Sequence, residues 1–311
     1  MVKNQVYDAI IVGGGPSGLT AGIYLSRAKL KTLILEKYVV GGTVNLTYEI
    51  KNYPGFKKIN GADLVVNMYE QALDCGVEIK YEDVTNYVLD KKIKEIITRN
   101  GTFFAKTVIL CNGASAKKLG LEKEDVFTGK GVSYCATCDG AFFKDQIVAV
   151  VGGGNTACED AIYLSNLAKQ VYIFVRKSNM IADKVLIDNV ESKKNIKILY
   201  NTQVSALLGN DRLEGVNIFN DLDNSEKTIK LSGLFVAIGR VPLLQSLPKE
   251  INLSKGGFVI TNENMETNIK GVYACGDIRE KSVKQIVTAC SDGAIAGSLA
   301  GKYVNGLKED E

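Results

Sequence analysis

One segment of the amino-acid sequence occurs twice. Residues 12–26 and residues 151–165 align without a gap at an offset of 139. In each copy an apolar strand leads into a glycine-rich loop, Gly13–Gly18 or Gly152–Ala157, and a helical segment follows. Glycines in such a loop allow a tight turn and let the backbone approach a pyrophosphate at the helix N-terminus. The repeat therefore predicts an α/β fold with two Rossmann-like dinucleotide-binding domains, and a glycine turn in an empty unit is the minority interpretation.

Apolar periodicity and turn residues indicate the other elements. The expected strands are Tyr7–Val12, Lys31–Leu35, Ile93–Ala105, Thr107–Ala114, Ile147–Val151, Gln170–Val175, Leu234–Gly239 and Gly271–Asp277, and the expected helices are about 16–28, 155–168 and 282–303. The polar residues after Ala114 and the segment Arg240–Pro248 are candidate hinges. Insertion of the second domain into the first explains both hinges. The boundaries are then 1–117 with 246–311 for the first domain and 118–245 for the second, which could swivel on the two connections.

The residues after each repeat indicate which nucleotide each domain binds. Glu36 ends the second strand of the first copy, where a carboxylate accepts hydrogen bonds from a ribose hydroxyl, so FAD is expected. The second copy has Val175 at that place, followed by Arg176 and Lys177. Two cations attract a 2′-phosphate, which favours NADPH over NADH, although a basic pair after a strand is often a solvated edge.

Cys135 and Cys138 lie between the two glycine loops. Two cysteines separated by two residues can close into an easily reduced disulfide, and the sequence has no histidine and no second close cysteine pair to complete a metal site. We therefore predict a redox-active pair and no metal. Asp139 is the adjacent acid and the candidate proton donor to a departing thiolate, although a helix-capping role would also suit it. The remaining five cysteines are expected to be buried free thiols: Cys75, Cys111, Cys158, Cys275 and Cys290.

Bulk composition is that of a soluble globular protein. The net charge is +3 and no basic run is interleaved with aromatic residues, so nucleic-acid binding is not expected. No apolar run approaches the ~18 residues of a membrane span, and the first residues lack the pattern of a secretory signal. We expect a cytoplasmic protein without a membrane partner.

The sequence resembles the low-molecular-weight, bacterial-type thioredoxin reductases over nearly its whole length. The stretches that carry the resemblance are Gly13–Gly18, Gly41-Gly42, Asn52-Tyr53-Pro54-Gly55, Cys135-Ala136-Thr137-Cys138-Asp139, Gly152–Glu159, Leu234–Arg240 and Gly276-Asp277 with Gln285. The resemblance implies a homodimer in which electrons pass from NADPH to FAD, to the Cys135–Cys138 disulfide, and to thioredoxin or a thioredoxin-like protein. One inserted domain can hardly present both the cysteine pair and the nicotinamide loop to the flavin at once, so we also expect residues of about 118–245 to rotate as a body.

The resemblance and the loop chemistry together give a set of expected contacts. For FAD they are Gly13, Gly15, Pro16, Ser17, Gly18, Glu36, Gly41, Gly42, Thr43, Asn52, Val84, Gly113, Gly276, Asp277, Gln285 and Ile286. For NADPH they are Gly152, Gly154, Asn155, Thr156, Ala157, Arg176, Lys177, Gly239 and Arg240.

Some positions depart from the family pattern. The family signature at the 2′-phosphate site reads His-Arg-Arg, followed four residues later by another Arg. Here the residues are Val175-Arg176-Lys177, with Ile181 at the last place, so only two cations remain to bind the 2′-phosphate. Cys111, Asn112 and Cys275 replace small residues or Thr near the expected flavin. The alternative function is therefore an NADH- or other-donor-dependent flavoprotein reductase of a peroxiredoxin-linked or glutaredoxin-like protein. A non-catalytic flavoprotein redox sensor is the remote alternative.

Overall fold

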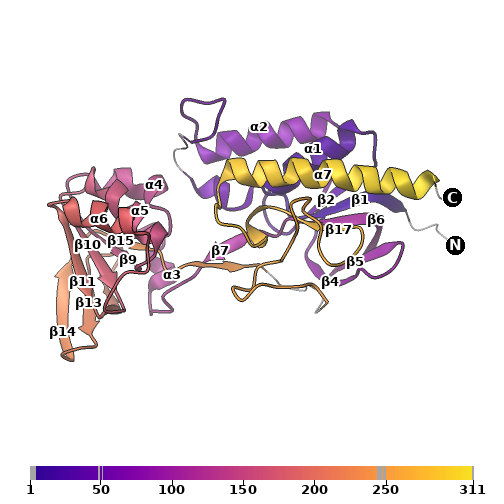
Figure 1. Ribbon diagram of the computed structural model, residues 1–311. Helices are drawn as coiled ribbons and strands as arrows, with labels where there is room; N and C mark the ends of the chain where they lie inside the picture. Colours follow the sequence, from indigo (N-terminus) through magenta and orange to yellow (C-terminus); the bar gives the residue numbers. More distant parts are fainter. Residues whose placement is uncertain (1–4, 48–49, 51, 244–246, 248–249, 310–311) are drawn as a thin grey trace. The chain divides into compact units, whose positions relative to one another are not determined.

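A computed structural model describes residues 5–47, 50, 52–243, 247 and 250–309. The chain divides into two compact units (Figure 1). Unit 1 comprises Met1–Ser115 and Val241–Glu311, and unit 2 comprises Ala116–Arg240. Unit 2 is therefore inserted into unit 1 in the order of the chain. One boundary expected from the sequence, at 245/246, lies outside the described residues.

Unit 1 is built on a seven-stranded sheet. Its strands are β1 (Val6–Val12), β2 (Thr32–Glu36), β3 (Glu78–Tyr81), β4 (Val84–Val88), β5 (Lys94–Thr98), β6 (Thr102–Leu110) and β17 (Val272–Ala274). The order is β3-β2-β1-β6-β5-β4, and β17 pairs with β6. Strands β3, β2, β1, β6 and β17 run parallel, whereas β4 and β5 join by antiparallel pairing. The carboxyl ends of the parallel strands meet at one sheet edge, where ligands bind in folds of this class.

Three helices pack in unit 1: α1 (Pro16–Arg27), α2 (Gly61–Asp74) and α7 (Ile286–Glu309), with short 3-10 turns at η1 (Gly42–Leu46) and η3 (Gly276–Ile278) (Figure 1). Helix α7 lies close against α1 because glycines face it. A Cβ on Gly293 would come within 2.2 Å of the Ser17 carbonyl oxygen, and one on Gly297 within 2.7 Å of the Ala21 carbonyl oxygen. Alternate residues of the central strands feed two apolar clusters, as Leu33 and Ile34 do.

Unit 2 contains a five-stranded parallel sheet in the order β11-β10-β9-β15-β8. Its strands are β8 (Val132–Ser133), β9 (Ile147–Val151), β10 (Gln170–Val175), β11 (Ile196–Tyr200) and β15 (Gly233–Val236). Its helical segments are α3 (Glu124–Phe127), α4 (Ala136–Asp139), η2 (Gly140–Phe143), α5 (Asn155–Ser165) and α6 (Lys184–Ser192). A separate antiparallel sheet contains β12 (Thr202–Leu208), β13 (Gly215–Asn220) and β14 (Ser225–Lys230). The prediction of two Rossmann-like units is confirmed.

The chain passes between the units twice, at 115/116 and at 240/241. The two passing segments, β7 (Ala114–Ala116) and β16 (Arg240–Pro242), pair as a two-stranded sheet. These segments coincide with the starts of the two candidate hinges, and residues 244–246 and 248 of the second hinge lie outside the described part of the chain.

Three expected elements need correction. The strand expected at Ile93–Ala105 is a hairpin of β5 and β6, because the chain turns at Asn100-Gly101, where the Thr98 amide bonds the Gly101 carbonyl at 2.8 Å. Strand β6 ends at Leu110 rather than continuing to Ala114, because Gly113 has a left-handed backbone (φ 74°). The last helix begins at Ile286 and ends at Glu309, not at 282 and 303.

Candidate active site

Cys135 is the N-cap residue of α4 in unit 2, and Cys138 lies inside that helix. They form a disulfide, with their Cα atoms 5.3 Å apart. Cys138 is 8% exposed, whereas Cys135 is half-buried and its sulfur lies 3.5 Å from the hydroxyl of the exposed Thr137. Cys135 is therefore the more exposed residue of the pair, an asymmetry that the sequence did not reveal.

Asp139 is held beside the pair by Ser133. The Ser133 hydroxyl donates to the Asp139 carboxylate at 2.6 Å and accepts from the Cys135 amide at 3.1 Å. Asp139 stands at the start of η2 but makes no side-chain capping bond there. The capping role suggested by the sequence is thus not found, and the carboxylate is anchored next to the dithiol instead. Sequence reasoning missed Ser133 because nothing in its local pattern distinguishes it from an ordinary strand residue.

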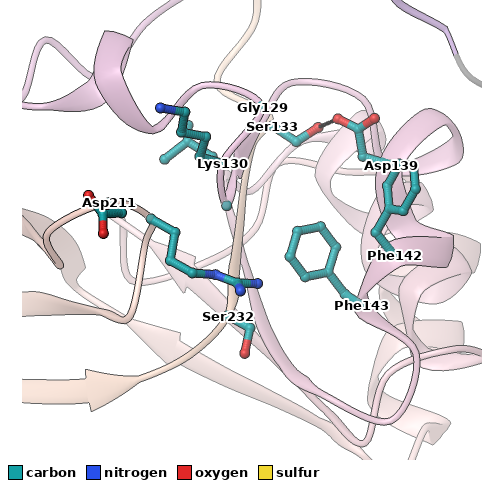
Figure 2. A pocket seen from close by; sticks show the side chains of 11 residues that line it. Gly129, Lys130, Ser133, Asp139, Phe142, Phe143, Asp211 and Ser232 are labelled. Atoms are coloured by element: carbon teal, nitrogen blue, oxygen red, sulfur yellow. Dashed lines mark hydrogen bonds between the residues drawn. The ribbon is translucent and has the colours of Figure 1, made fainter.

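A cavity of about 410 Å³ opens beside this network (Figure 2). It is lined by Gly129, Lys130, Gly131, Val132, Ser133, Asp139, Phe142, Phe143, Asp211, Arg212 and Ser232. Figure 2 shows Ser133 and Asp139 joined at one side, with the ring of Phe143 facing into the cavity. Phe142 is 58% exposed. The dithiol therefore has next to it, within the same unit, a recess lined by two aromatic rings and by charged side chains of both signs.

The first glycine loop packs tightly against its own unit on two sides and is open on the third. A Cβ on Gly13 would come within 2.3 Å of the Cys111 carbonyl oxygen, and one on Gly18 within 2.0 Å of the Gly13 carbonyl oxygen. A Cβ on Gly15 would meet nothing within 4 Å. The loop thus needs glycine for its fold at Gly13 and Gly18, whereas Gly15 borders open space at the N-terminus of α1.

Glu36 ends β2 and lies beside this loop. Its carboxylate accepts hydrogen bonds from the amides of Gly14 at 2.7 Å and Tyr38 at 2.9 Å. Val84 is near the same end of the sheet, since the preceding Asp83 pairs with Lys37 at 3.2 Å. Carboxylate oxygens still have lone pairs for a ribose hydroxyl after two such bonds.

Segments distant in sequence join the first loop. Gly41 donates its amide to the Gly14 carbonyl at 2.8 Å, and Gly42 and Thr43 follow in η1. The Asn52 side chain donates to Gln285 at 3.1 Å, just before Ile286 begins α7. A Cβ on Gly276 would lie 2.5 Å from the Ser17 hydroxyl, which places the Gly276-Asp277 turn against the start of α1.

Asp292 anchors that turn, and sequence reasoning missed it. Its buried carboxylate accepts from the Gly276 amide at 3.0 Å and pairs with Arg279 at 3.1 Å and Lys281 at 2.9 Å. A buried carboxylate is stable when it is paired and hydrogen-bonded in this way. Asp292 lies on α7, and only the fold brings it to the loop.

The residues of this region suit a flavin dinucleotide. Gly15 borders open space, and the buried Asn112 side-chain oxygen makes no hydrogen bond of normal geometry among the described residues. A buried acceptor of this kind needs a partner. An amide or hydroxyl group of a bound flavin would supply one.

The second glycine loop repeats the geometry. A Cβ on Gly152 would come within 2.3 Å of the Ala237 carbonyl oxygen, and one on Gly154 would meet nothing within 4 Å. Ala157 replaces the third glycine and is fully buried. The Asn155 side chain both donates to and receives from Asp183, at 2.8 Å each. The open side of the loop again lies at a helix N-terminus.

The side chains expected to hold a 2′-phosphate are solvent-exposed. Arg176 and Lys177 follow β10 and are exposed, as are Thr156 and Arg240, while Gly239 has a left-handed backbone (φ 107°). Ile181 is 70% exposed, and its amide bonds the Gly153 carbonyl at 2.7 Å. Ile181 therefore lies beside the loop, at an exposed position where the family pattern has an Arg.

Asp160, on α5, has a raised pKa. Burial raises the pKa of Asp160 to about 7, with the Glu159 carboxylate adding to the rise and Arg240 opposing it. Since protonation favours the folded state, the stability from this group is complete below about pH 4 and is lost as the pH rises through 7. We expect Asp160→Asn to raise the melting temperature by a few degrees at pH 8, and the gap to close as the pH falls to 4.

Thermal unfolding at pH 4, 6 and 8 checks this, with the exposed Asp188→Asn as the matched control. A gap that does not change with pH would show that Asp160 is ionised in the fold.

The prediction of five buried thiols holds for Cys111, Cys158 and Cys275, whereas Cys75 and Cys290 are only partly buried. No group of three or more metal-ligating side chains occurs among the described residues. Within the same residues, no helix is both long and apolar enough to span a bilayer.

Comparison with known proteins decides the family. A family model described as "Pyridine nucleotide-disulphide oxidoreductase" matches residues 7–293. The thioredoxin reductase of Listeria monocytogenes is 40% identical over 99% of this chain and 97% of its own length, and that of Mycoplasma pneumoniae is 43% identical over 95% of each. The crystal structure of the thioredoxin reductase from Streptococcus pyogenes matches with a TM-score of 0.82 at 37% identity, over 98% of this chain and 100% of that one.

The chain belongs to the thioredoxin reductase family. Members of this family are NADPH-dependent flavoprotein oxidoreductases, which confirms the reaction class predicted from the two glycine loops and the cysteine pair. The disulfide found between Cys135 and Cys138 fits the redox-active centre of the family.

Proposed function

We propose that this protein transfers electrons from NADPH, through FAD and the Cys135–Cys138 disulfide, to the disulfide of thioredoxin or a thioredoxin-like protein. The observation that carries the proposal is the Cys135–Cys138 disulfide, in which Cys135 is the more exposed residue, with an adjoining recess. We further propose that the protein acts in the cytoplasm as a homodimer.

Each glycine loop holds one dinucleotide in this proposal. The open space at Gly15 receives the pyrophosphate of FAD, with Glu36 accepting from the adenosine ribose. The open space at Gly154 receives that of NADPH, with Arg176 and Lys177 at the 2′-phosphate. FAD, when bound, accepts a hydride and delivers two electrons to a disulfide. Because one inserted unit carries both the dithiol and the second loop, we propose that unit 2 rotates on β7 and β16 to use each in turn.

Cys135 is the proposed nucleophile toward the partner protein. After the pair is reduced, the Cys135 thiolate attacks one sulfur of the partner disulfide, and the other partner sulfur leaves as a thiolate. Cys138 then attacks the mixed disulfide, which restores the Cys135–Cys138 bond and releases the second partner thiol. Asp139, anchored by Ser133, supplies the proton to a departing thiolate.

The recess at Phe142 is the proposed contact surface for the partner. It adjoins Asp139, and Lys130 and Arg212 line it. An apolar side chain inserted beside an exposed aromatic ring loses water-accessible area on both proteins, which is how such contacts contribute affinity.

Direct reduction assays test the function. The purified protein should be yellow, release FAD on heating, and oxidise NADPH when thioredoxin is added.

NADPH should be favoured over NADH by about 10- to 100-fold in kcat/KM, since two cations contact the 2′-phosphate. Arg176→Ala with Lys177→Ala should remove that preference without changing turnover with NADH. Equal use of NADH would favour the alternative donor, and turnover only with a peroxiredoxin-linked or glutaredoxin-like protein would favour the alternative substrate. A flavoprotein that reduces none of them would be a redox sensor.

Asp139→Asn should slow reduction of the protein disulfide by about 100-fold, because the leaving thiolate loses its proton donor. Flavin reduction by NADPH should be unchanged, and stopped-flow absorbance separates the two half-reactions. If the variant keeps the activity of the unmodified protein over the whole pH range, the proton comes from water instead.

A further inference from the structure

A second pair of cysteines lies inside unit 1. Strands β6 and β17 run parallel with Leu110 opposite Ala274, and the next residue on each is a cysteine, Cys111 or Cys275. The Cys275 amide donates to the Leu110 carbonyl at 3.0 Å, which extends the pairing to this point. The two sulfur atoms are 3.1 Å apart. Residues separated by 164 positions in the sequence thus bring two thiols into contact.

The strand pairing places the two cysteines within reach of a disulfide. Neighbouring strands lie about 4.8 Å apart, inside the roughly 4.4–6.8 Å between Cα atoms that a disulfide accepts. The sulfur separation is also shorter than the roughly 3.5–4.0 Å at which non-bonded heavy atoms usually pack. The two sulfur atoms are therefore already in contact before any bond forms.

The surroundings of the two thiols do not suit a metal ion. Cys111 is 5% exposed and Cys275 is fully buried. Burial raises the pKa of the Cys275 thiol well above its usual range, and the Cys111 thiol raises it further. Two neutral thiols are poor metal ligands, and no cluster of three ligating side chains occurs in the described part of the chain.

We propose that Cys111 and Cys275 form a second redox-active pair, distinct from Cys135–Cys138, which a hydroperoxide converts to a disulfide. The peroxide oxidises Cys111, which is 5% exposed against 0% for Cys275, to a sulfenic acid and leaves as water or an alcohol. Cys275 then displaces the sulfenic oxygen as water, and the S–S bond forms. In total, two thiols lose two electrons and two protons, and the peroxide gains them. A small dithiol reverses the reaction.

The bond would act on the region beneath the first glycine loop. The Cys111 carbonyl touches the position of a Gly13 Cβ, and Gly276 directly follows Cys275. The chain between the two cysteines contains all of unit 2, so the disulfide would close a loop around the whole insertion. Linking positions so far apart restricts the unfolded chain strongly, and the oxidised form should melt at a higher temperature.

Peptide mapping tests the proposal without relying on activity. The intact holoprotein is treated with hydrogen peroxide, alkylated while unfolding, digested and analysed by mass spectrometry. We expect a peptide linking Cys111 to Cys275 that dithiothreitol removes, and a melting temperature raised by roughly 5 °C or more. Cys275→Ala should lose both effects. Cys158→Ala, which removes a buried thiol next to Met180 rather than next to a cysteine, should keep both.

Two outcomes would overturn the proposal. One is that both thiols are still alkylated when the peroxide-treated protein is unfolded. The other is that Cys111 accumulates as a sulfinic acid, or links to another cysteine, with no Cys111–Cys275 peptide. The map of the unmodified protein decides the question even if Cys275→Ala does not fold.

Discussion

Replacing Cys135 or Cys138 with serine is expected to lower NADPH-dependent reduction of a protein disulfide by roughly 10³-fold or more, because both sulfurs are needed to carry two electrons. Flavin reduction by NADPH should remain, since the dithiol lies after the flavin in the electron path. Steady-state turnover with thioredoxin and anaerobic stopped-flow reduction of the flavin measure the two steps separately.

The two variants should also differ from each other. In Cys138→Ser the more exposed cysteine of the pair, Cys135, remains, so it should form a stable mixed disulfide with the partner that survives gel electrophoresis without reductant. In Cys135→Ser the remaining thiol is 8% exposed and should trap far less partner. Near-normal turnover in either variant would make the disulfide structural, and efficient trapping by Cys138 would reverse the proposed roles. Cys75→Ser, which changes a partly buried thiol on another element, is the matched control.

Alanine at Gly15 or Gly154 is expected to remove one dinucleotide without disturbing the fold. Each glycine has ordinary extended backbone angles (φ −73° and −99°), and a Cβ would meet nothing within 4 Å. The methyl group instead enters the space proposed for a pyrophosphate. Gly15→Ala should therefore be purified with little flavin. Gly154→Ala should be yellow, with a KM for NADPH raised about 10- to 100-fold.

Flavin content by absorbance and the KM for NADPH are the measurements, and melting curves confirm folding. Gly101→Ala is the control, because Gly101 also has open space around it but lies in the β5–β6 turn. Full flavin content in Gly15→Ala would show that the FAD pyrophosphate does not bind at Gly15. An unchanged KM for NADPH in Gly154→Ala would show that the NADPH pyrophosphate does not bind at Gly154.

Much of the fold was predictable because its signals are local. The duplicated strand, glycine loop and helix occupy contiguous residues, and their strand bounds agree closely with β1, β9 and β10. The glycines follow from backbone geometry that no other residue adopts cheaply, as Gly152 shows with a φ of 147°. The hairpin at Asn100-Gly101 was missed because the apolar pattern of β5 runs into that of β6 across a short turn.

The sequence by itself determined the two Rossmann-like units, the reaction class and the redox pair, since each depends on residues that are neighbours along the chain. Only the tertiary structure brought Ser133 to Asp139, Asp292 to Gly276 and Cys111 to Cys275. The last two contacts join positions that are separated along the chain and meet only when the sheet of unit 1 forms and α7 packs on it. Sequence patterns report local periodicity, whereas such contacts depend on how the packed elements are arranged.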